Sequence, residues 1–256
     1  MDRLSQFSLA GKRALVTGSS RGIGFALATA LADAGAELIL NSRDTSALGE
    51  ATANLAAAGA RARGVAFDVT NADSVADAVE FIEAEIGPID ILINNAGMQH
   101  RAPLEDFPED KFEQIMATNV TSVFLVGQAV ARCMIPRGAG KIVNICSLMS
   151  SVARASISPY ATSKAAVANL TRGMATEWAR HGLNVNGIAP GYFKTPLNAA
   201  LTADPEFNGW LTKRTPMGRW GEVEELGGAA IFLSSDAASF VNGHILYVDG
   251  AFMATV

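Results

Sequence analysis

Short apolar runs recur along the chain and alternate with longer stretches of helical composition. The strand-like runs span residues 13–17, 37–41, 63–67, 89–94, 141–147, 184–188 and 245–248. The stretch at 25–34, which is rich in alanine and leucine, is typical of the helices predicted between them. Strands that alternate with helices usually pair in parallel and carry helices on both faces of the sheet. We therefore predict an α/β fold with a doubly wound parallel sheet of about seven strands.

The whole chain, residues 1–256, is predicted to form a single domain. Its 256 residues are enough to bury a large core, and 49% of them are hydrophobic, with no polar tract typical of disorder. No linker rich in Pro, Gly or Ser and no internal repeat divides the sequence. Ligands of such sheets bind outside the carboxyl ends of the strands, where Gly18, Asn94, Ser147 and Pro190 are expected to lie.

Charge and cysteine content exclude several classes of partner and site. The net charge is −5 without a basic cluster, which argues against nucleic acid or an anionic membrane surface as a partner. Residues 1–11 do not resemble a signal peptide, and no segment has about eighteen unbroken apolar residues, so we predict a cytoplasmic protein. Cys133 and Cys146 form no disulfide framework, and no His/Cys cluster indicates a metal. Cys146 is interpreted as a buried strand cysteine rather than a nucleophile.

Three residues in the second half of the chain suggest carbonyl chemistry. Tyr160 and Lys164 stand four residues apart, and Ser147 ends an apolar strand thirteen residues before the tyrosine. A phenol has a pKa of about 10, so a cation on the same helix face is needed to favour the phenolate near neutral pH. Ser147 can hydrogen-bond the oxygen of the same carbonyl. On an ordinary helix the same spacing gives a packed tyrosine and a solvated lysine, so the interpretation depends on the rest of the chain.

A glycine-rich turn follows the first predicted strand and precedes the first predicted helix. Gly18, Gly22 and Gly24 are spaced Gly-x3-Gly-x-Gly, which differs from the common Gly-x-Gly-x2-Gly dinucleotide fingerprint. Glycines in such a turn let the backbone approach a pyrophosphate, which then faces the amide groups at the helix N-terminus. The order strand, glycine turn and helix therefore favours a dinucleotide site.

These motifs together resemble the short-chain dehydrogenase/reductase family over essentially the whole chain. The matching positions are Thr17 to Gly24, Asn94 to Gly97, Asn119, Ser147, Tyr160 with Lys164, Pro190 with Gly191, and Thr195. The resemblance implies a Rossmann-like fold and hydride transfer between a nicotinamide cofactor and a secondary alcohol or ketone. Within the family, the segments 7–11, 87–90, 188–195 and 213–221 resemble the gluconate 5-dehydrogenases, also called 5-ketogluconate reductases.

The resemblance also implies roles for individual residues. Ser147 binds the carbonyl oxygen, Tyr160 donates a proton to it, and Lys164 with a water held by Asn119 replaces that proton. Asp68 hydrogen-bonds the adenine, although Asp-Val-Thr is also typical of a strand end followed by a helix cap. The implied cofactor site comprises Gly18, Ser20, Arg21, Gly22, Ile23, Gly24, Ser42, Arg43, Asp68, Val69, Asn94, Ala96, Gly97, Tyr160, Lys164, Pro190, Gly191, Phe193 and Thr195.

Charge near the end of the second predicted strand bears on the choice of cofactor. An NAD-preferring enzyme uses a carboxylate there to bind the ribose diol, and this carboxylate repels a 2′-phosphate. Asp44 has the expected spacing, but it is better placed to cap the helix that begins near Thr45. Arg43, with Arg21 in the glycine turn, can bind a phosphate through charge-assisted hydrogen bonds, unless both are plain surface charges. We therefore predict NADP(H) as the preferred cofactor, with NAD(H) as the alternative.

The expected small-molecule substrate is a ketone or alcohol of the sugar-acid class, with gluconate and 5-ketogluconate as the first pair. Arg101 and Arg154 are candidate carboxylate anchors, because a guanidinium matches two carboxylate oxygens, although either can be a solvated charge. Met149 and Tyr192 are further candidate substrate residues. The gluconate enzymes carry glutamine and glutamate where this chain has Met149 and Ser151, which leaves the substrate open. The alternatives are a 3-oxoacyl thioester reductase and, from another class, a catalytically idle NADP(H)-binding regulatory protein.

Two further features concern assembly and access to the site. The helices expected at 111–134 and 160–180 suggest association, because the alanines of the second permit close packing with another subunit or with the sheet. The family resemblance implies a homotetramer. Segment 192–220 carries Phe207, Trp210 and Trp220 among polar residues and is a plausible lid, or else a packing or subunit contact.

Overall fold

The protein is described by a computed structural model that covers residues 3–255, so residues 1–2 and 256 of the expected domain lie outside the described part. Within this part the sheet has seven strands in the order β3-β2-β1-β4-β5-β6-β7, and every pair is parallel. The strands are β1 (Arg13–Val16), β2 (Glu37–Leu40), β3 (Ala62–Gly64), β4 (Ile91–Asn94), β5 (Gly140–Ile145), β6 (Leu183–Pro190) and β7 (Ile245–Val248). The predicted doubly wound fold is confirmed.

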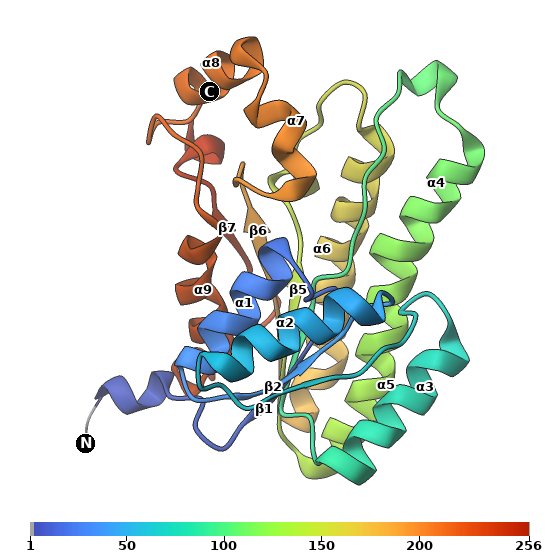
Figure 1. Ribbon diagram of the computed structural model, residues 1–256, viewed down its shortest axis with the longest axis vertical. Helices are drawn as coiled ribbons and strands as arrows, with labels where there is room; N and C mark the ends of the chain where they lie inside the picture. Colours follow the sequence, from blue (N-terminus) through green and yellow to red (C-terminus); the bar gives the residue numbers. More distant parts are fainter. Residues whose placement is uncertain (1–2, 256) are drawn as a thin grey trace.

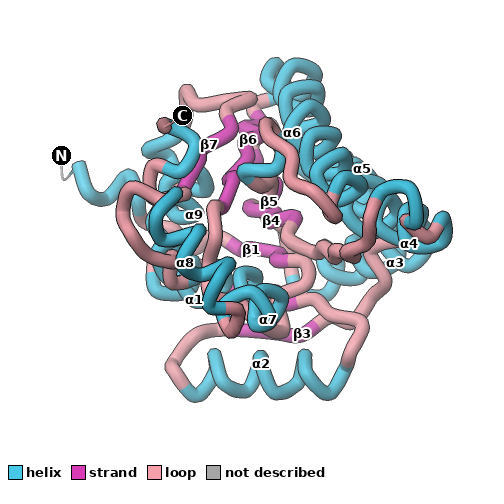
Figure 2. The backbone as a smooth tube through the Cα atoms, turned by 90° about the horizontal axis from the view of Figure 1, so that it is seen from above, coloured by secondary structure: helices cyan, strands magenta, loops and turns pink. Residues whose placement is uncertain are grey.

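Helices cover both faces of this sheet, as Figure 2 shows from above. They are α1 (Gly22–Asp33), α2 (Thr45–Ala57), α3 (Ala72–Phe81), α4 (Glu109–Met116), α5 (Ser122–Arg137), α6 (Ser158–Trp178), α7 (Ala199–Thr202), α8 (Pro205–Arg214) and α9 (Gly227–Ser234). One core lies between the sheet and α3, α5 and α6, and a second lies between the sheet and α1, α2 and α9. The inner strands β1, β2, β4, β5 and β6 are therefore buried on both sides, which explains their largely apolar sequences, whereas the edge strand β3 is mostly exposed.

The strand order reverses between β1 and β4, so the chain winds outward in opposite directions from this point. Crossovers from the carboxyl ends of these two strands diverge, and a crevice opens between them. Figure 1 shows α7 and α8 beyond the same ends of the strands. The topology therefore places the expected site residues, which follow β1, β4, β5 and β6, around one opening.

The third strand is shorter than the apolar pattern predicts. We expect a strand over 63–67, but β3 ends at Gly64. Beyond it the carbonyl oxygens of Val65 and Phe67 accept hydrogen bonds from the Asn41 side-chain amide at 3.3 and 3.0 Å. Val65 N still donates to the Leu40 carbonyl oxygen of β2 at 2.9 Å, so the Asn41 side chain serves as partner only for the two carbonyl oxygens beyond the end of the ladder.

Within residues 3–255, the helical stretch Glu109–Arg137 is long and apolar enough to cross a membrane by length and composition alone. Its mean hydropathy is 1.2, and 44% of its most apolar part is buried inside the fold. In the fold its α5 part packs against α3, β4 and β5. Its apolar side chains are therefore explained by the core of the domain.

Candidate active site

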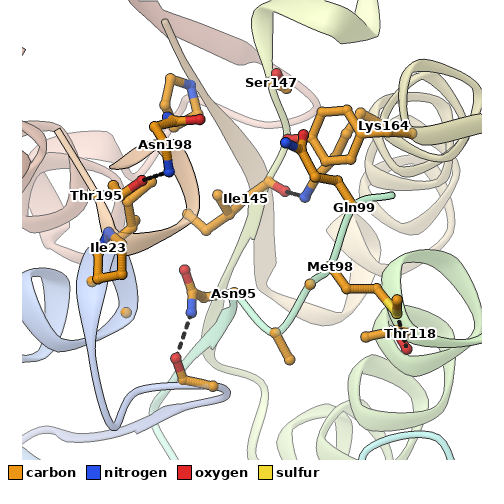
Figure 3. Close-up of a pocket in the computed structure, with 18 of the residues that line it drawn as sticks. Ile23, Asn95, Met98, Gln99, Thr118, Ile145, Ser147, Lys164, Thr195 and Asn198 are labelled. Carbon is orange, nitrogen blue, oxygen red and sulfur yellow. Dashed lines mark hydrogen bonds between the residues drawn. The ribbon is translucent and has the colours of Figure 1, made fainter. Parts of the chain in front are cut away.

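A cavity of about 620 Å³ lies at the carboxyl ends of the central strands. Its wall includes most of the residues singled out from the sequence, and Figure 3 shows part of this wall. They are Gly18, Ser20, Arg21, Gly22, Ile23, Gly24, Ser42, Arg43, Asp68, Val69, Ala96, Gly97, Arg101, Ser147, Met149, Arg154, Tyr160, Lys164, Pro190, Gly191, Tyr192, Phe193 and Thr195. Asn94 and Asn119 were expected there too, but both are buried behind the wall.

Backbone packing gives the glycine turn its shape. Gly18 has φ +60°, in the left-handed region, and a Cβ there would lie 2.9 Å from the Ala96 Cα atom. At Gly24 a Cβ would lie 2.4 Å from Asn95 Nδ2 and 2.5 Å from the Gly18 carbonyl oxygen. The Asn95 amide also donates to the carbonyl oxygens of Thr17 and Gly18, both at 2.9 Å. Only glycine fits at these positions, so the unusual spacing still produces a tight turn.

Helix α1 presents an open N-terminus to the cavity. Its N-cap residue, Arg21, makes no side-chain capping hydrogen bond, and Gly22, Ile23 and Gly24 of the first turn line the wall. The amide groups of a first helical turn have no intrahelical acceptor, and the helix dipole adds partial positive charge. This end of the cavity is therefore suited to an anionic group such as a pyrophosphate.

The end of β2 carries the groups expected to select the cofactor. Asp44 caps α2 by accepting from Ala47 N at 3.0 Å, which confirms the capping interpretation. Arg43 instead reaches Asp68, with 3.6 Å between Nη1 and Oδ2. Asp68 Oδ1 accepts from both the amide and the hydroxyl of Thr70. Burial acts to raise the pKa of Asp68, but these hydrogen bonds and the Arg43 charge outweigh it, so the pKa is lowered.

Ser147 and Tyr160 meet at the centre of the cavity. Ser147 follows β5, and its hydroxyl accepts from Met149 N at 3.1 Å, which fixes the side chain at the N-terminus of a short 3₁₀ turn. Burial raises the pKa of the Tyr160 phenol, and a hydrogen bond with Ser147 acts in the opposite direction. The Lys164 ammonium lies over the same ring, 5.9 Å from its centroid.

Lys164 is held by a backbone carbonyl rather than by a carboxylate. Its Nζ atom donates to the Ile145 carbonyl oxygen at 2.6 Å, a contact drawn in Figure 3. Burial lowers the pKa of Lys164 to about 8, partly opposed by Cys146. Cys146 itself is buried and has a pKa raised to about 11, so it is a poor nucleophile, as predicted.

Asn119 lies in a π-helical turn (Ala117–Thr121) between α4 and α5. Its Nδ2 atom donates to the Met98 carbonyl and the Ser163 hydroxyl, both at 2.9 Å, and its Oδ1 accepts from Met98 N at 2.8 Å. An amide oxygen has two lone pairs, so one acceptor position of Oδ1 remains. A Cβ at Gly97 would lie 3.4 Å from this oxygen and 3.8 Å from Lys164 Nζ, so Gly97 keeps the space between them open.

Asn94 belongs to the core rather than to the cavity. Its Nδ2 atom donates to Asn144 Oδ1 on β5 at 2.9 Å, and Asn144 Nδ2 donates to the Thr171 hydroxyl on α6 at 2.9 Å. All three side chains are at most 3% exposed. This chain of hydrogen bonds joins β4, β5 and α6 beneath the residues that point into the cavity.

The substrate end of the cavity is basic. Arg101, after β4, and Arg154, after β5, both line it, and burial together with the Arg154 charge lowers the pKa of Arg101. The Gln99 amide oxygen, when it is turned toward Arg101, accepts hydrogen bonds from the Nη2 and Nε atoms of Arg101 at 3.0 and 3.2 Å. Tyr192 lies between β6 and the helices above; its hydroxyl is buried without a hydrogen-bond partner in the described residues.

An aromatic cluster packs around Tyr192 at this end of the cavity. Tyr192 makes ring contacts at 5.6–6.2 Å between centroids with four other aromatic residues, namely Phe207, Trp210, Trp220 and Phe252. Phe207 and Trp210 lie on α8, and Trp220 Nε1 donates to Asn208 Oδ1 at 2.7 Å. The aromatic residues of the expected lid therefore form one packed unit above Tyr192. Met149 joins the same apolar cluster.

Sequence reasoning did not single out Gln99 or the Asn95 side chain. Gln99 lines the cavity and reaches toward Ser147 in Figure 3. Its place directly after the Asn94 to Gly97 segment was the available signal, although no spacing rule points to this residue itself. The Asn95 amide fixes the glycine turn, which the motif Asn94 to Gly97 does not indicate.

Comparison with known proteins identifies the class. A family model described as "Enoyl-(Acyl carrier protein) reductase" matches residues 18–252. The chain belongs to the short-chain dehydrogenase/reductase family. It is an oxidoreductase that acts on CH–OH groups.

Individual relatives are similar over nearly their full length. A protein named gluconate 5-dehydrogenase from Gluconobacter oxydans (strain 621H) is 61% identical over 244 residues, 95% of each chain. A 5-keto-D-gluconate 5-reductase from Escherichia coli (strain K12) is 53% identical over 250 residues, 98% of each chain. A crystal structure of a gluconate 5-dehydrogenase from Burkholderia cenocepacia J2315 in complex with NADP and tartrate is 52% identical, covers 99% of each chain and superposes with a TM-score of 0.97.

Proposed function

We propose that the protein is an NADP(H)-dependent oxidoreductase that interconverts gluconate and 5-ketogluconate. The observation that carries this proposal is the presence of Arg101 in the same cavity as Ser147 and Tyr160. The Arg101 guanidinium can bind the carboxylate of a keto sugar acid while the ketone carbon of the same molecule lies at Ser147 and Tyr160. The names of the two relatives with 61% and 53% identity support the same pair of compounds.

The cofactor end of the cavity fits NADP(H). The turn at Gly18 and Gly24 leaves no room for side chains, and the amides of α1 are open to a pyrophosphate. We assign Arg43, which follows β2, to a 2′-phosphate and Asp68 to the adenine, since both line the cavity. We assign Gly191 and Thr195, which also line it, to the nicotinamide carboxamide; a Cβ at Gly191 would lie 2.7 Å from the Asp249 Cα atom. The complex of the 52% identical neighbour with NADP supports this assignment.

The protein residues bind the carbonyl oxygen and move a proton. NADP(H), when bound, supplies or accepts the hydride. Ser147 donates a hydrogen bond to the carbonyl oxygen, and Tyr160 protonates that oxygen as negative charge develops on it. Lys164 and a water at the free lone pair of Asn119 Oδ1 return a proton to Tyr160. Oxidation of the alcohol runs the same steps in reverse.

A panel of substrates tests this proposal directly. Purified protein should oxidise NADPH with 5-ketogluconate and reduce NADP⁺ with gluconate. If an acetoacetyl thioester is turned over with a kcat/KM about tenfold or more above that for 5-ketogluconate, the thioester reductase is the correct assignment. Binding of NADPH without turnover of any ketone in the panel contradicts the enzymatic role and favours the regulatory alternative.

We also propose that the protein is a homotetramer that works in the cytoplasm. Phe112 and Phe124, on α4 and α5, are 42% and 44% exposed, which suits a face covered by another copy. Both cysteines are free, which suits a reducing compartment. Sedimentation at micromolar concentration tests the assembly, and a lone monomer contradicts it. A Phe124→Ser variant should shift the equilibrium toward smaller species.

A further inference from the structure

The wall of the cavity carries far more positive than negative charge. Among the described residues that line it are five cations, namely Arg21, Arg43, Arg101, Arg154 and Lys164, and one carboxylate, Asp68. The protein as a whole has a net charge of −5, so this concentration of positive charge is local. Arg43 and Arg21 lie at the cofactor end, where phosphates are expected. The charge of Arg154, at the substrate end, is left without an assigned anion.

Arg154 is held in place without an anionic partner. Its guanidinium stacks on the ring of Phe207 in α8, with 5.0 Å from Cζ to the ring centroid. Its Nε atom is buried and has no hydrogen-bond partner in residues 3–255, and no ion pair there includes Arg154. The Tyr192 hydroxyl is also buried without a partner. Buried donors of this kind are costly unless a ligand satisfies them.

The two arginines of the substrate end are brought together by a contact between their loops. Ala102 N donates to the Ser156 carbonyl oxygen at 3.1 Å, so the residue after Arg101 is tied to the loop of Arg154. Ser156 has φ +69°, a left-handed conformation that a non-glycine residue rarely adopts. The contact between the loops therefore keeps the two arginines on the same side of the cavity, where the Arg154 charge helps burial to lower the pKa of Arg101.

We propose that the substrate end holds two carboxylates, one at Arg101 and one at Arg154, and that the enzyme also acts on hydroxy and keto dicarboxylates. This inference rests on the proposed reductase function and extends it to a second substrate class. A monocarboxylate such as gluconate offers one anion, whereas the guanidiniums of Arg101 and Arg154, together with the Tyr192 hydroxyl, offer enough donors for two carboxylates. The reaction is the same: NADPH gives a hydride to the ketone carbon, Tyr160 gives a proton to its oxygen, and NADP⁺ and the hydroxy dicarboxylate are formed.

Glucarate is the probe that tests this inference, because it differs from gluconate by a second terminal carboxylate. Initial rates of NADP⁺ reduction are measured with glucarate and with gluconate for the wild type and for Arg154→Met and Arg101→Met. Calorimetric titration of glucarate into the enzyme with NADP⁺ measures binding independently of turnover. Arg214→Met is the matched control, because Arg214 stacks on Phe252 at 4.4 Å in the same aromatic cluster but does not line the cavity.

We expect the wild type to bind glucarate at least as tightly as gluconate and to oxidise it. Arg154→Met should lower the ratio of kcat/KM for glucarate to that for gluconate by about tenfold or more, whereas Arg101→Met should lower kcat/KM for both. Arg214→Met should leave the ratio unchanged. Melting temperatures show whether each variant folds. If Arg154→Met does not fold, Arg154→Gln takes its place.

Two results overturn the inference. One is that the wild type neither binds nor oxidises glucarate. The other is an unchanged ratio in folded Arg154 variants, which means that both arginines serve one carboxylate or that Arg154 only packs on Phe207. The proposed function fails separately, through the absence of gluconate turnover in the wild type. Oxidation of glucarate but not gluconate supports the dicarboxylate site while rejecting the sugar monoacid as substrate.

Discussion

The cofactor end of the cavity is shaped by backbone, whereas the substrate end is shaped by side chains from separate loops. At the cofactor end, an added Cβ at Gly18 or Gly24 meets main-chain atoms within 3 Å, and the Asn95 amide locks the turn. At the substrate end, Arg154 and Tyr192 carry buried polar atoms that no described residue satisfies.

This difference shows where chemistry and specificity reside in the molecule. At the cofactor end the shape of the cavity is set by main-chain atoms, which a substitution does not replace. This end therefore fits one kind of ligand and tolerates few substitutions. The side chains at the substrate end can be exchanged one at a time without altering the sheet. Ser147 and Tyr160 lie between the two ends and serve whichever substrate the outer side chains admit. The following experiments probe this division.

The largest effect is expected from the residue shared by both ends. Tyr160→Phe should lower turnover by about a hundredfold or more, the usual scale for loss of a positioned acid, because the phenol is the proposed proton donor. NADPH binding, measured by fluorescence titration, should change little. Near-normal reduction of 5-ketogluconate by this variant shows that the proton comes from another group.

The pH dependence of reduction tests the lysine behind that tyrosine. Burial lowers the pKa of Lys164 to about 8, so the side chain is charged below this pH and loses its proton above it. If protonated Lys164 resupplies Tyr160, kcat/KM for NADPH-dependent reduction should fall by up to about tenfold per pH unit above about pH 8. The profile is recorded from about pH 6 to about pH 10, over which an arginine stays charged. A Lys164→Arg variant should lose the break, and a flat wild-type profile excludes the role of Lys164 as the titrating group.

At the cofactor end, one side chain is expected to distinguish the two nicotinamide cofactors. Arg43→Ala should reduce the preference for NADPH over NADH by roughly 1.5 to 3 kcal/mol, about 10- to 150-fold in kcat/KM, through loss of charge-assisted hydrogen bonds to the 2′-phosphate. Arg61→Ala is the matched control, since Arg61 pairs with Glu37 outside the cavity. Equal efficiency of the wild type with both cofactors contradicts the assignment.

A carboxylate introduced at the end of β2 refines the same test. Ser42→Asp should shift the preference further toward NAD(H), because Ser42 lines the cavity. Asn41 is not a suitable position. It is 2% exposed, and its side chain donates to the Phe67 carbonyl and accepts from Gly18 N. A carboxylate there could not donate to the Phe67 carbonyl oxygen and would bury a negative charge, which would destabilise the fold.

At the substrate end, the smallest effect is expected from the residue that orients an arginine. Gln99→Ala should raise KM for gluconate by about two- to tenfold with little change in kcat, because Arg101 loses the amide that holds it. Gln114→Ala, on exposed α4, is the control. A change in kcat without a change in KM indicates instead that Gln99 acts at the reacting carbonyl.

The fold was largely predictable because the central strands are buried on both faces. Alternation of apolar runs with helices indicates the parallel sheet, and six of the seven runs end within two residues of the observed strand ends. The seventh is β3, which stops at Gly64, and beyond it the Asn41 amide donates to the carbonyl oxygens of Val65 and Phe67. A side chain that substitutes for a strand leaves no mark in the hydrophobic pattern.

The site was predictable where local order decides it and less so where distant loops meet. The glycine turn and the spacing of Tyr160 and Lys164 are local, so the sequence places them. The contact between the loops of Arg101 and Arg154 spans more than fifty residues, and no periodicity encodes it. The inward Gln99 amide likewise depends on how its loop leaves β4.

The hydrogen-bonded chain of Asn94, Asn144 and Thr171 bears on how the chain assembles. Asn94 and Asn144 are directly paired in the register of β4 and β5, and both side chains are buried. A shift of one residue in the register of these strands would leave both side-chain amides without hydrogen-bond partners in an apolar core. Each unsatisfied group would lower the free energy of unfolding by about 1–3 kcal/mol. A wrong register is therefore penalised between β4 and β5, the strand that Ser147 follows. These buried hydrogen bonds therefore help to specify the register of β4 and β5, on which the position of the reacting centre depends.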